Sequence, residues 1–144
     1  MNQPANPPTR PIWEDPETGR IRIIDQRKLP NQMAISELTS VDDVIFAICE
    51  MMVRGAPLIG VTGAYGVYLA FAAHPEDPDA AAREAARIRA ARPTAVNLAW
   101  AVDQTLKTAL AAAKNDPAEA ARQKAAAIAE QEAENSRLIG DYGL

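Results

Sequence analysis

Apolar and polar positions alternate near the start of the chain, as expected for β-structure. Residues 20–23 (Arg-Ile-Arg-Ile) follow the pattern of a half-buried strand. Turn-forming residues at 15–19 (Asp-Pro-Glu-Thr-Gly) separate this segment from a short extended run before it. Residues 28–31 interrupt the chain again, ahead of a third extended run at 33–38. The pattern over residues 11–38 therefore predicts a small antiparallel β meander.

The period then changes, and residues from about 40 to 140 predict a helical part. Ser40 followed by Asp43 resembles a capping box, with a hydroxyl first and a carboxylate three residues on. Apolar residues follow at spacings of three and four, which gives one apolar helix face. We expect this first helix to stop near Arg54-Gly55, because glycine readily adopts the left-handed conformation after a last turn.

Prolines mark the starts of the remaining helices, because proline suits the first helical position. The expected helices begin at Pro57, at Pro78 (running to about Ala90), at Arg92-Pro93-Thr94, and at Pro117 (running to about Leu138 and ended by Gly140). The chain is therefore predicted to be α+β, with a short β meander followed by a helical domain.

The apolar stretch 56–73 is the one segment that raises the question of a membrane. Its length is marginal for a span, and it contains Gly60, Gly63 and Gly66. Each glycine weakens an isolated helix, so their use must be to let another backbone come near. The pattern favours a buried, tightly packed core helix over a membrane helix.

Composition and charge exclude several classes of protein. Apolar residues make up 48% of the 144, which is not a disordered composition, although residues 1–10 are expected to form a disordered tail. The net charge of −4 argues against general nucleic-acid binding, which needs a basic face. The N-terminus lacks the features of a secretory signal, and the single cysteine allows no internal disulfide, so a cytoplasmic setting is expected.

Few side chains offer catalytic or metal-binding chemistry. His74 is the only histidine and is expected to have a capping or surface role. Cys49 lies on the first amphipathic helix beside Ile48, where a buried thiol acts as a small hydrophobe. No Cys/His cluster and no glycine-rich phosphate loop occurs in the sequence. We therefore assign no catalytic residue, no metal ligand and no cofactor.

Two arginines stand ahead of expected helix starts, where anions bind well. Arg54 and Gly55 precede the second helix, and Arg92 opens a later one. The first N–H groups of a helix lack internal partners, and the helix dipole favours negative charge there. The alternative is that each arginine is a solvated or salt-bridged surface residue, and the residue pattern alone does not favour anion binding over it.

Several segments resemble a known enzyme family. Residues 53–61 (Val-Arg-Gly-Ala-Pro-Leu-Ile-Gly-Val) resemble the RGAPxIG signature of methylthioribose-1-phosphate isomerases and their relatives. Residues 92–101 resemble the family's RPTAVNLxWA stretch, and residues 23–30 are similar to its strand and turn near the start. Residues 135–140 resemble the helix end before the family's second domain. The matches occur in the family's order and cover about residues 12–144.

This resemblance implies a substrate and a set of site residues. The family converts 5-methylthioribose 1-phosphate to 5-methylthioribulose 1-phosphate in methionine salvage, without cofactor or metal. It implies substrate binding by Arg54, Gly55 and Ala56 of the first signature and by Arg92 of the second. It also implies a small N-terminal domain of β meander plus helices, followed by a Rossmann-like domain, in a protein that usually forms a homodimer.

The sequence departs from the family at its C-terminus. The family's Rossmann-like domain is absent, and its catalytic cysteine and aspartate fall beyond residue 144; Cys49 does not occupy the cysteine's motif. We therefore expect a fragment, a truncated gene product or half of a split enzyme, inactive alone and completed by a C-terminal domain in trans. Such a chain is expected to expose apolar surface and to self-associate.

Three other interpretations remain open. Ribose-1,5-bisphosphate isomerase shares the fold and part of the signature, although residues 25–30 and 92–100 favour methylthioribose phosphate. A regulatory module related to translation-initiation nucleotide-exchange subunits would need no catalytic pair. A purely structural helical domain would use its Ala-rich helices to bind a partner.

Overall fold

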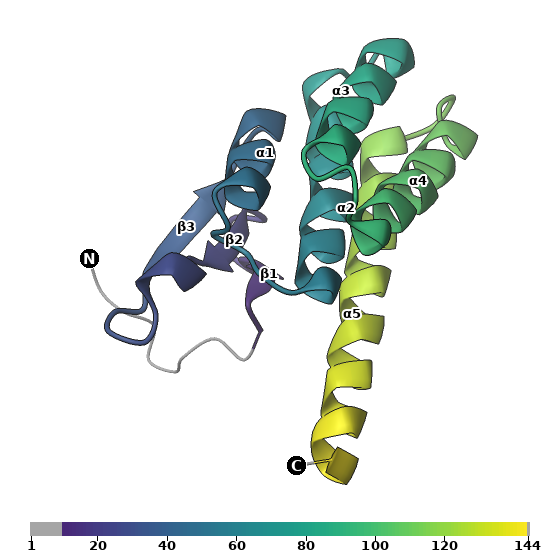
Figure 1. Cartoon of the computed structure of the whole chain (residues 1–144). Helices are drawn as coiled ribbons and strands as arrows, with labels where there is room; N and C mark the ends of the chain where they lie inside the picture. Colours follow the sequence, from purple (N-terminus) through teal and green to yellow (C-terminus); the bar gives the residue numbers. More distant parts are fainter. Residues whose placement is uncertain (1–9, 144) are drawn as a thin grey trace.

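The computed structural model describes the backbone of residues 10–143 and the side-chain surroundings of residues 10–135. The expected disordered tail at 1–10 lies, apart from its last residue, outside the described residues. The elements are β1 (Ile12–Glu14), β2 (Ile21–Ile24), the 3-10 helix η1 (Gln26–Lys28), β3 (Ile35–Leu38), α1 (Val41–Cys49), α2 (Ala56–Ala73), α3 (Pro78–Ala90), α4 (Val96–Ala111) and α5 (Pro117–Gly143). In Figure 1 the sheet and α1 lie to one side of α2, and α3, α4 and α5 lie to the other. The α+β class is confirmed.

The three strands form the predicted antiparallel meander, in the order β1-β2-β3. Ile21 and Ile23 of β2 are buried, and Arg22 between them pairs with Asp15 and Glu37. The first turn forms because the Asp15 carboxylate accepts a hydrogen bond from the Glu17 N–H at 2.8 Å. The alternation at residues 20–23 therefore identified β2 and its buried face.

Helix α1 begins as expected but ends earlier than expected. The Ser40 hydroxyl accepts from the Asp43 N–H at 3.1 Å, as a capping residue should. The helix stops at Cys49 and not near Gly55, because Met51 adopts the left-handed conformation with φ 61°. The Met52 N–H then donates to the Ala47 carbonyl at 2.9 Å, which is the bond that defines a Schellman motif.

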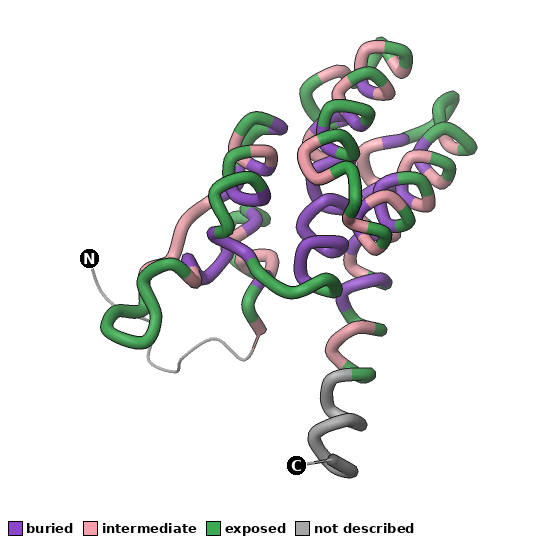
Figure 2. The backbone as a smooth tube through the Cα atoms, viewed as in Figure 1, coloured by how far each residue is buried: buried purple, intermediate pink, exposed green. Residues whose placement is uncertain are grey.

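Helix α2 is the centre of the molecule. It packs against α1, α3, α4 and α5 and touches β1. Figure 2 shows buried residues along much of its length. It is long and apolar enough to cross a membrane by length and composition, but 67% of it is buried inside the fold. The prediction of a tightly packed core helix is confirmed.

The glycines of α2 allow the close packing that the sequence predicted. At one of them the neighbour is the backbone of another helix. A Cβ at Gly60 would lie 3.0 Å from the Asn97 carbonyl oxygen, so there the backbones of α2 and α4 approach closely. A Cβ at Gly63 would lie 2.4 Å from the Leu98 Cδ1, and one at Gly66 would lie 2.7 Å from the Ile88 Cδ1. At these two positions the missing methyl group makes room for side chains.

Two further helix boundaries differ from the predictions. Helix α4 begins at Val96 and not at Arg92, because residues 92–95 form a turn in which the Ala95 N–H donates to the Arg92 carbonyl at 2.9 Å. Helix α5 continues through Gly140 to Gly143, so that glycine does not end it. Helix α3 spans the predicted 78–90, and its capping Asp77 accepts from the Ala80 N–H at 3.0 Å.

Several large apolar side chains are exposed within the described part of the chain. On α4, Val96 is 78% exposed and Trp100, one turn later, is 49% exposed. Others are Leu29, Met33, Phe46, Met51 and Leu110. Cys49 is also exposed, so its interpretation as a buried small hydrophobe was wrong; it follows Ile48 but lies at the helix end, outside the core.

Candidate anion-binding site

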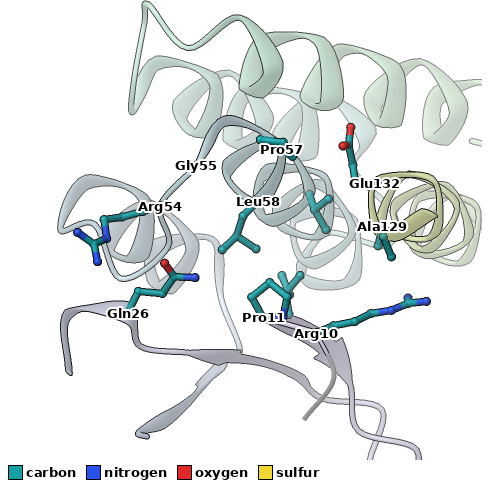
Figure 3. A pocket seen from close by; sticks show the side chains of 12 residues that line it. Arg10, Pro11, Gln26, Arg54, Gly55, Pro57, Leu58, Ala129 and Glu132 are labelled. Atoms are coloured by element: carbon teal, nitrogen blue, oxygen red, sulfur yellow. The ribbon is translucent and has the colours of Figure 1, made fainter. Parts of the chain in front are cut away.

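A cleft of about 530 Å³ opens where the start of α2 meets the sheet and α5. Figure 3 shows Gly55, Pro57 and Leu58 on one side of it, Pro11 and Arg10 on another, and Ala129 and Glu132 of α5 opposite Gln26 and Arg54. The lining residues are Arg10, Pro11, Ile12, Gln26, Arg54, Gly55, Pro57, Leu58, Val61, Ala129, Glu132 and Ala133. Its size lies in the range of small-molecule sites.

The start of α2 lies at the edge of this cleft and leaves backbone N–H groups without partners among the described residues. Gly55 is the N-cap, with φ 94°, a conformation that a side chain would disfavour, and it offers no side-chain cap. Pro57 has no N–H, and the first bond of the helix runs from the Ile59 N–H to the Gly55 carbonyl at 3.0 Å. No described residue accepts from the Ala56 or Leu58 N–H. This uncapped end therefore has the chemistry of an anion site.

Arg54 precedes that helix start and lies between two hollows. It lines the cleft and also an adjoining cavity of about 400 Å³ that includes Arg27, Glu50 and Met51. Figure 3 shows its guanidinium group on the side of the cleft away from α5. Among the described residues no carboxylate forms an ion pair with Arg54. Its charge is thus available to a ligand.

The segment after β2 supports the Arg54 loop. Asp25 is buried, and its carboxylate accepts from the Arg27 Nε and NH2 groups at 3.0 and 2.9 Å. The Arg27 side-chain bonds hold the pKa of Asp25 below its ordinary value, against the opposing effect of burial. The Gln26 N–H donates to the Met52 carbonyl at 2.8 Å, which ties η1 to the segment just before Arg54. The Gln26 side chain then lines both hollows.

Arg92 and Ala56 do not line the cleft. The turn that holds Arg92 is nevertheless next to the end of α1, since the Cys49 Sγ lies 3.7 Å from the Ala91 carbonyl oxygen. The close approach of Gly60 to Asn97 likewise brings the first turns of α2 and α4 together. The two predicted arginine segments therefore belong to neighbouring loops, while only Arg54 and Gly55 reach this cleft.

Helix α5 contributes one acidic residue to the cleft lining, which sequence reasoning missed. Glu132 lies in the lining, and Glu130 pairs with Arg10 at 2.8 Å. Their positions depend on α5 returning beside α2, and no local motif signals that packing. Gln26 was also missed as a lining residue, although it lies within the segment 23–30 whose pattern resembled the family.

A charged network joins the sheet to α2 and α5 nearby. The Arg122 NH1 donates to both Glu14 oxygens at 3.2 and 3.3 Å, and Arg122 also pairs with Glu119. The Tyr65 hydroxyl donates to Glu14 at 3.5 Å. Burial, together with the Glu14 charge, raises the pKa of Tyr65 to about 12. Among the described residues no group of three or more His, Cys, Asp or Glu side chains could hold a metal ion.

Comparison with known proteins identifies relatives over nearly the whole chain. It is 53% identical over 143 residues to the methylthioribose-1-phosphate isomerase of Desulfosudis oleivorans. The aligned region covers 95% of this chain and 38% of that protein. It is 43% identical over 137 residues to an uncharacterized protein in the petC 3' region of Rhodospirillum rubrum, covering 74% of that protein. The chain thus spans little more than a third of the isomerase it matches.

Solved structures share the fold. The 5-methylthioribose 1-phosphate isomerase of Pyrococcus horikoshii aligns over 85% of this chain and 36% of its own, with a TM-score of 0.73 and 29% identity. The delta subunit of translation initiation factor eIF-2B from A. fulgidus aligns over 88% of this chain and 37% of its own, with a TM-score of 0.69 and 34% identity. The Initiation factor 2 subunit family matches residues 52–144, and the chain belongs to that family.

Proposed function

We propose that this member of the Initiation factor 2 subunit family is the N-terminal substrate-binding part of a methylthioribose-1-phosphate isomerase. The reaction is the aldose–ketose isomerisation of 5-methylthioribose 1-phosphate to 5-methylthioribulose 1-phosphate. The observation that carries the proposal is the uncapped start of α2, with Arg54 beside it and without an ion-pair partner among the described residues. The 53% identity to a named isomerase supports the choice of substrate.

The phosphate group is proposed to bind at the Arg54–Gly55–Ala56 segment. A phosphate oxygen placed there accepts from the Ala56 and Leu58 N–H groups, and the Arg54 guanidinium supplies a charged donor. Arg92 is proposed to reach the same phosphate from the turn after α3, which touches the end of α1 and does not itself line the cleft. This arrangement needs no cap at Gly55, because the ligand itself would satisfy the free N–H groups.

Catalysis is proposed to depend on residues outside this chain. The resemblance puts the catalytic cysteine and aspartate beyond Leu144. Moving hydrogen between two sugar carbons requires a positioned acid and base. We therefore expect this chain alone to bind the sugar phosphate without turning it over, and a C-terminal domain supplied in trans to restore turnover.

Calorimetric titration of the chain with methylthioribose 1-phosphate tests the binding role. We expect Arg54→Met to weaken binding by about tenfold or more, because a hydrogen bond to a charged group contributes about 1.5–3 kcal/mol. Arg92→Met should weaken it as well. The matched control is Arg83→Met on α3, which lines neither hollow. Wild-type affinity in the Arg54 variant would refute the proposed site.

The similarity to the eIF-2B delta subunit favours a second candidate, a non-catalytic regulatory module. Such a module would bind a partner protein and would not discriminate among small sugar phosphates. Competition with ribose 1,5-bisphosphate in the same titration separates the enzyme alternatives. If the wild-type chain bound neither sugar phosphate, the regulatory function would become the better proposal.

A further inference from the structure

Gln26 has a position that its own packing does not explain. Its backbone is fixed on both sides: the Asp25 N–H donates to the Ala34 carbonyl at 2.8 Å, and the Gln26 N–H donates to the Met52 carbonyl at 2.8 Å. Asp25 also caps η1 by accepting from the Arg27 N–H at 3.0 Å. The Gln26 backbone is thus held rigidly. Its bonding partner Met52 lies two residues before Arg54, so the bond keeps Gln26 next to the Arg54 segment.

The Gln26 side chain, in contrast, is free. It is half-buried and lines both the cleft and the adjoining cavity, and Arg54 is the other residue common to the two. Within the described residues its amide group makes no hydrogen bond. Figure 3 shows this amide between Arg54 and Leu58, on the same side of the cleft as the guanidinium group. A rigid backbone that presents an unpaired amide to a cleft is an arrangement suited to a ligand.

The chemistry of an amide complements that of Arg54. A guanidinium group only donates hydrogen bonds, whereas the Gln26 side chain donates from Nε2 and accepts at Oε1. A sugar phosphate presents both acceptors, on the phosphate, and donors, on the hydroxyl groups next to it. An amide beside a cation can therefore bind the sugar hydroxyl next to a phosphate group, and inorganic phosphate has no such sugar hydroxyl.

We propose that Gln26 is a ligand-binding residue of this cleft, accepting from a sugar hydroxyl while Arg54 binds the adjacent phosphate. This inference rests on the proposed function and adds to it a residue that selects a phosphorylated sugar over free phosphate.

The test compares Gln26→Met with wild type by calorimetric titration of the chain. Gln32→Met is the matched control, since Gln32 lies in the following loop and lines neither hollow. For Gln26→Met we expect about tenfold weaker binding of methylthioribose 1-phosphate, a smaller change for inorganic phosphate, and an unchanged thermal midpoint. Gln26→Glu keeps the shape and adds a negative charge, so it should weaken binding of both ligands.

The outcomes separate this inference from the proposed function. If Arg54→Met loses affinity but Gln26→Met binds the sugar phosphate as wild type does, the role of Gln26 is refuted and the site stands. A lowered thermal midpoint in both Gln26 variants would show a structural role and would also refute it. If the wild-type chain binds neither ligand, both proposals fail.

Discussion

Replacing Gly63 by alanine should destabilise the chain, although alanine is the better helix former. The new Cβ would lie 2.4 Å from the Leu98 Cδ1 and 3.2 Å from the Val102 Cγ2. Leu98 and Val102 are 0% and 1% exposed, so neither side chain can swing into solvent. Overpacking destabilises a fold by about 1–3 kcal/mol, whereas the higher helix propensity of alanine over glycine stabilises it by about 1 kcal/mol. Because the first contact is so short, we expect a net loss of about 1–2 kcal/mol.

A double-mutant cycle with Leu98→Ala isolates this clash. Leu98→Ala alone should cost about 2–5 kcal/mol, because it leaves a cavity. Once Leu98 is truncated, Gly63→Ala should become neutral or stabilising by up to about 1 kcal/mol, since its methyl group fills part of that cavity. The expected coupling is therefore about 2 kcal/mol. Urea unfolding followed by far-UV circular dichroism measures all four variants, and additive effects within about 0.5 kcal/mol would refute the reasoning.

Three further predictions follow from particular residues. The pKa of Tyr65 is about 12 in the fold and near 10 when unfolded, so the free energy of unfolding should fall as the pH rises from 10 to 12. In a pH series of urea unfolding curves, Tyr65→Phe should reduce this pH dependence of stability. Met51→Gly should stabilise the chain by about 0.5–1 kcal/mol in thermal unfolding, because Met51 is held at φ 61° and glycine adopts that conformation freely. The exposed Val96 and Trp100 should promote self-association, so Trp100→Glu should lower the apparent mass in light scattering; a monodisperse wild-type monomer would contradict this.

The parts of the fold that the sequence predicted well are those set by local chemistry. The β2 strand follows its alternation, and the turn before it follows the Asp15 carboxylate. Helix α3 has the predicted bounds because Asp77 caps it and Pro78 opens it. Each of these signals lies within a few residues of the structure it determines, so no knowledge of tertiary packing was required.

The misplaced boundaries arise where tertiary packing overrides a local preference. The first helix ends at Cys49, and the left-handed residue after it is Met51, which has no preference for that conformation. It is held there because the Met52 N–H bonds the Ala47 carbonyl and both of these residues are buried in the core. Gly55, which was expected to end that helix, instead begins α2. Near the C-terminus, Gly140 was expected to end the last helix, but it lies within α5, which continues to Gly143.

The candidate site shows both the reach and the limit of sequence reasoning. Arg54 and Gly55 could be identified because an arginine before a helix start is a local pattern with a clear electrostatic consequence. Gln26 could not, because its position beside Arg54 depends on a hydrogen bond to Met52, a residue far along the chain. That bond also depends on the early end of α1, since the Schellman turn directs the Met52 carbonyl toward the sheet side. The left-handed turn at Met51 therefore connects the core to the cleft. We expect Met51→Gly to be more stable and to keep the affinity for the sugar phosphate. That result would show that the turn geometry, and not the methionine side chain, holds Gln26 and Arg54 together.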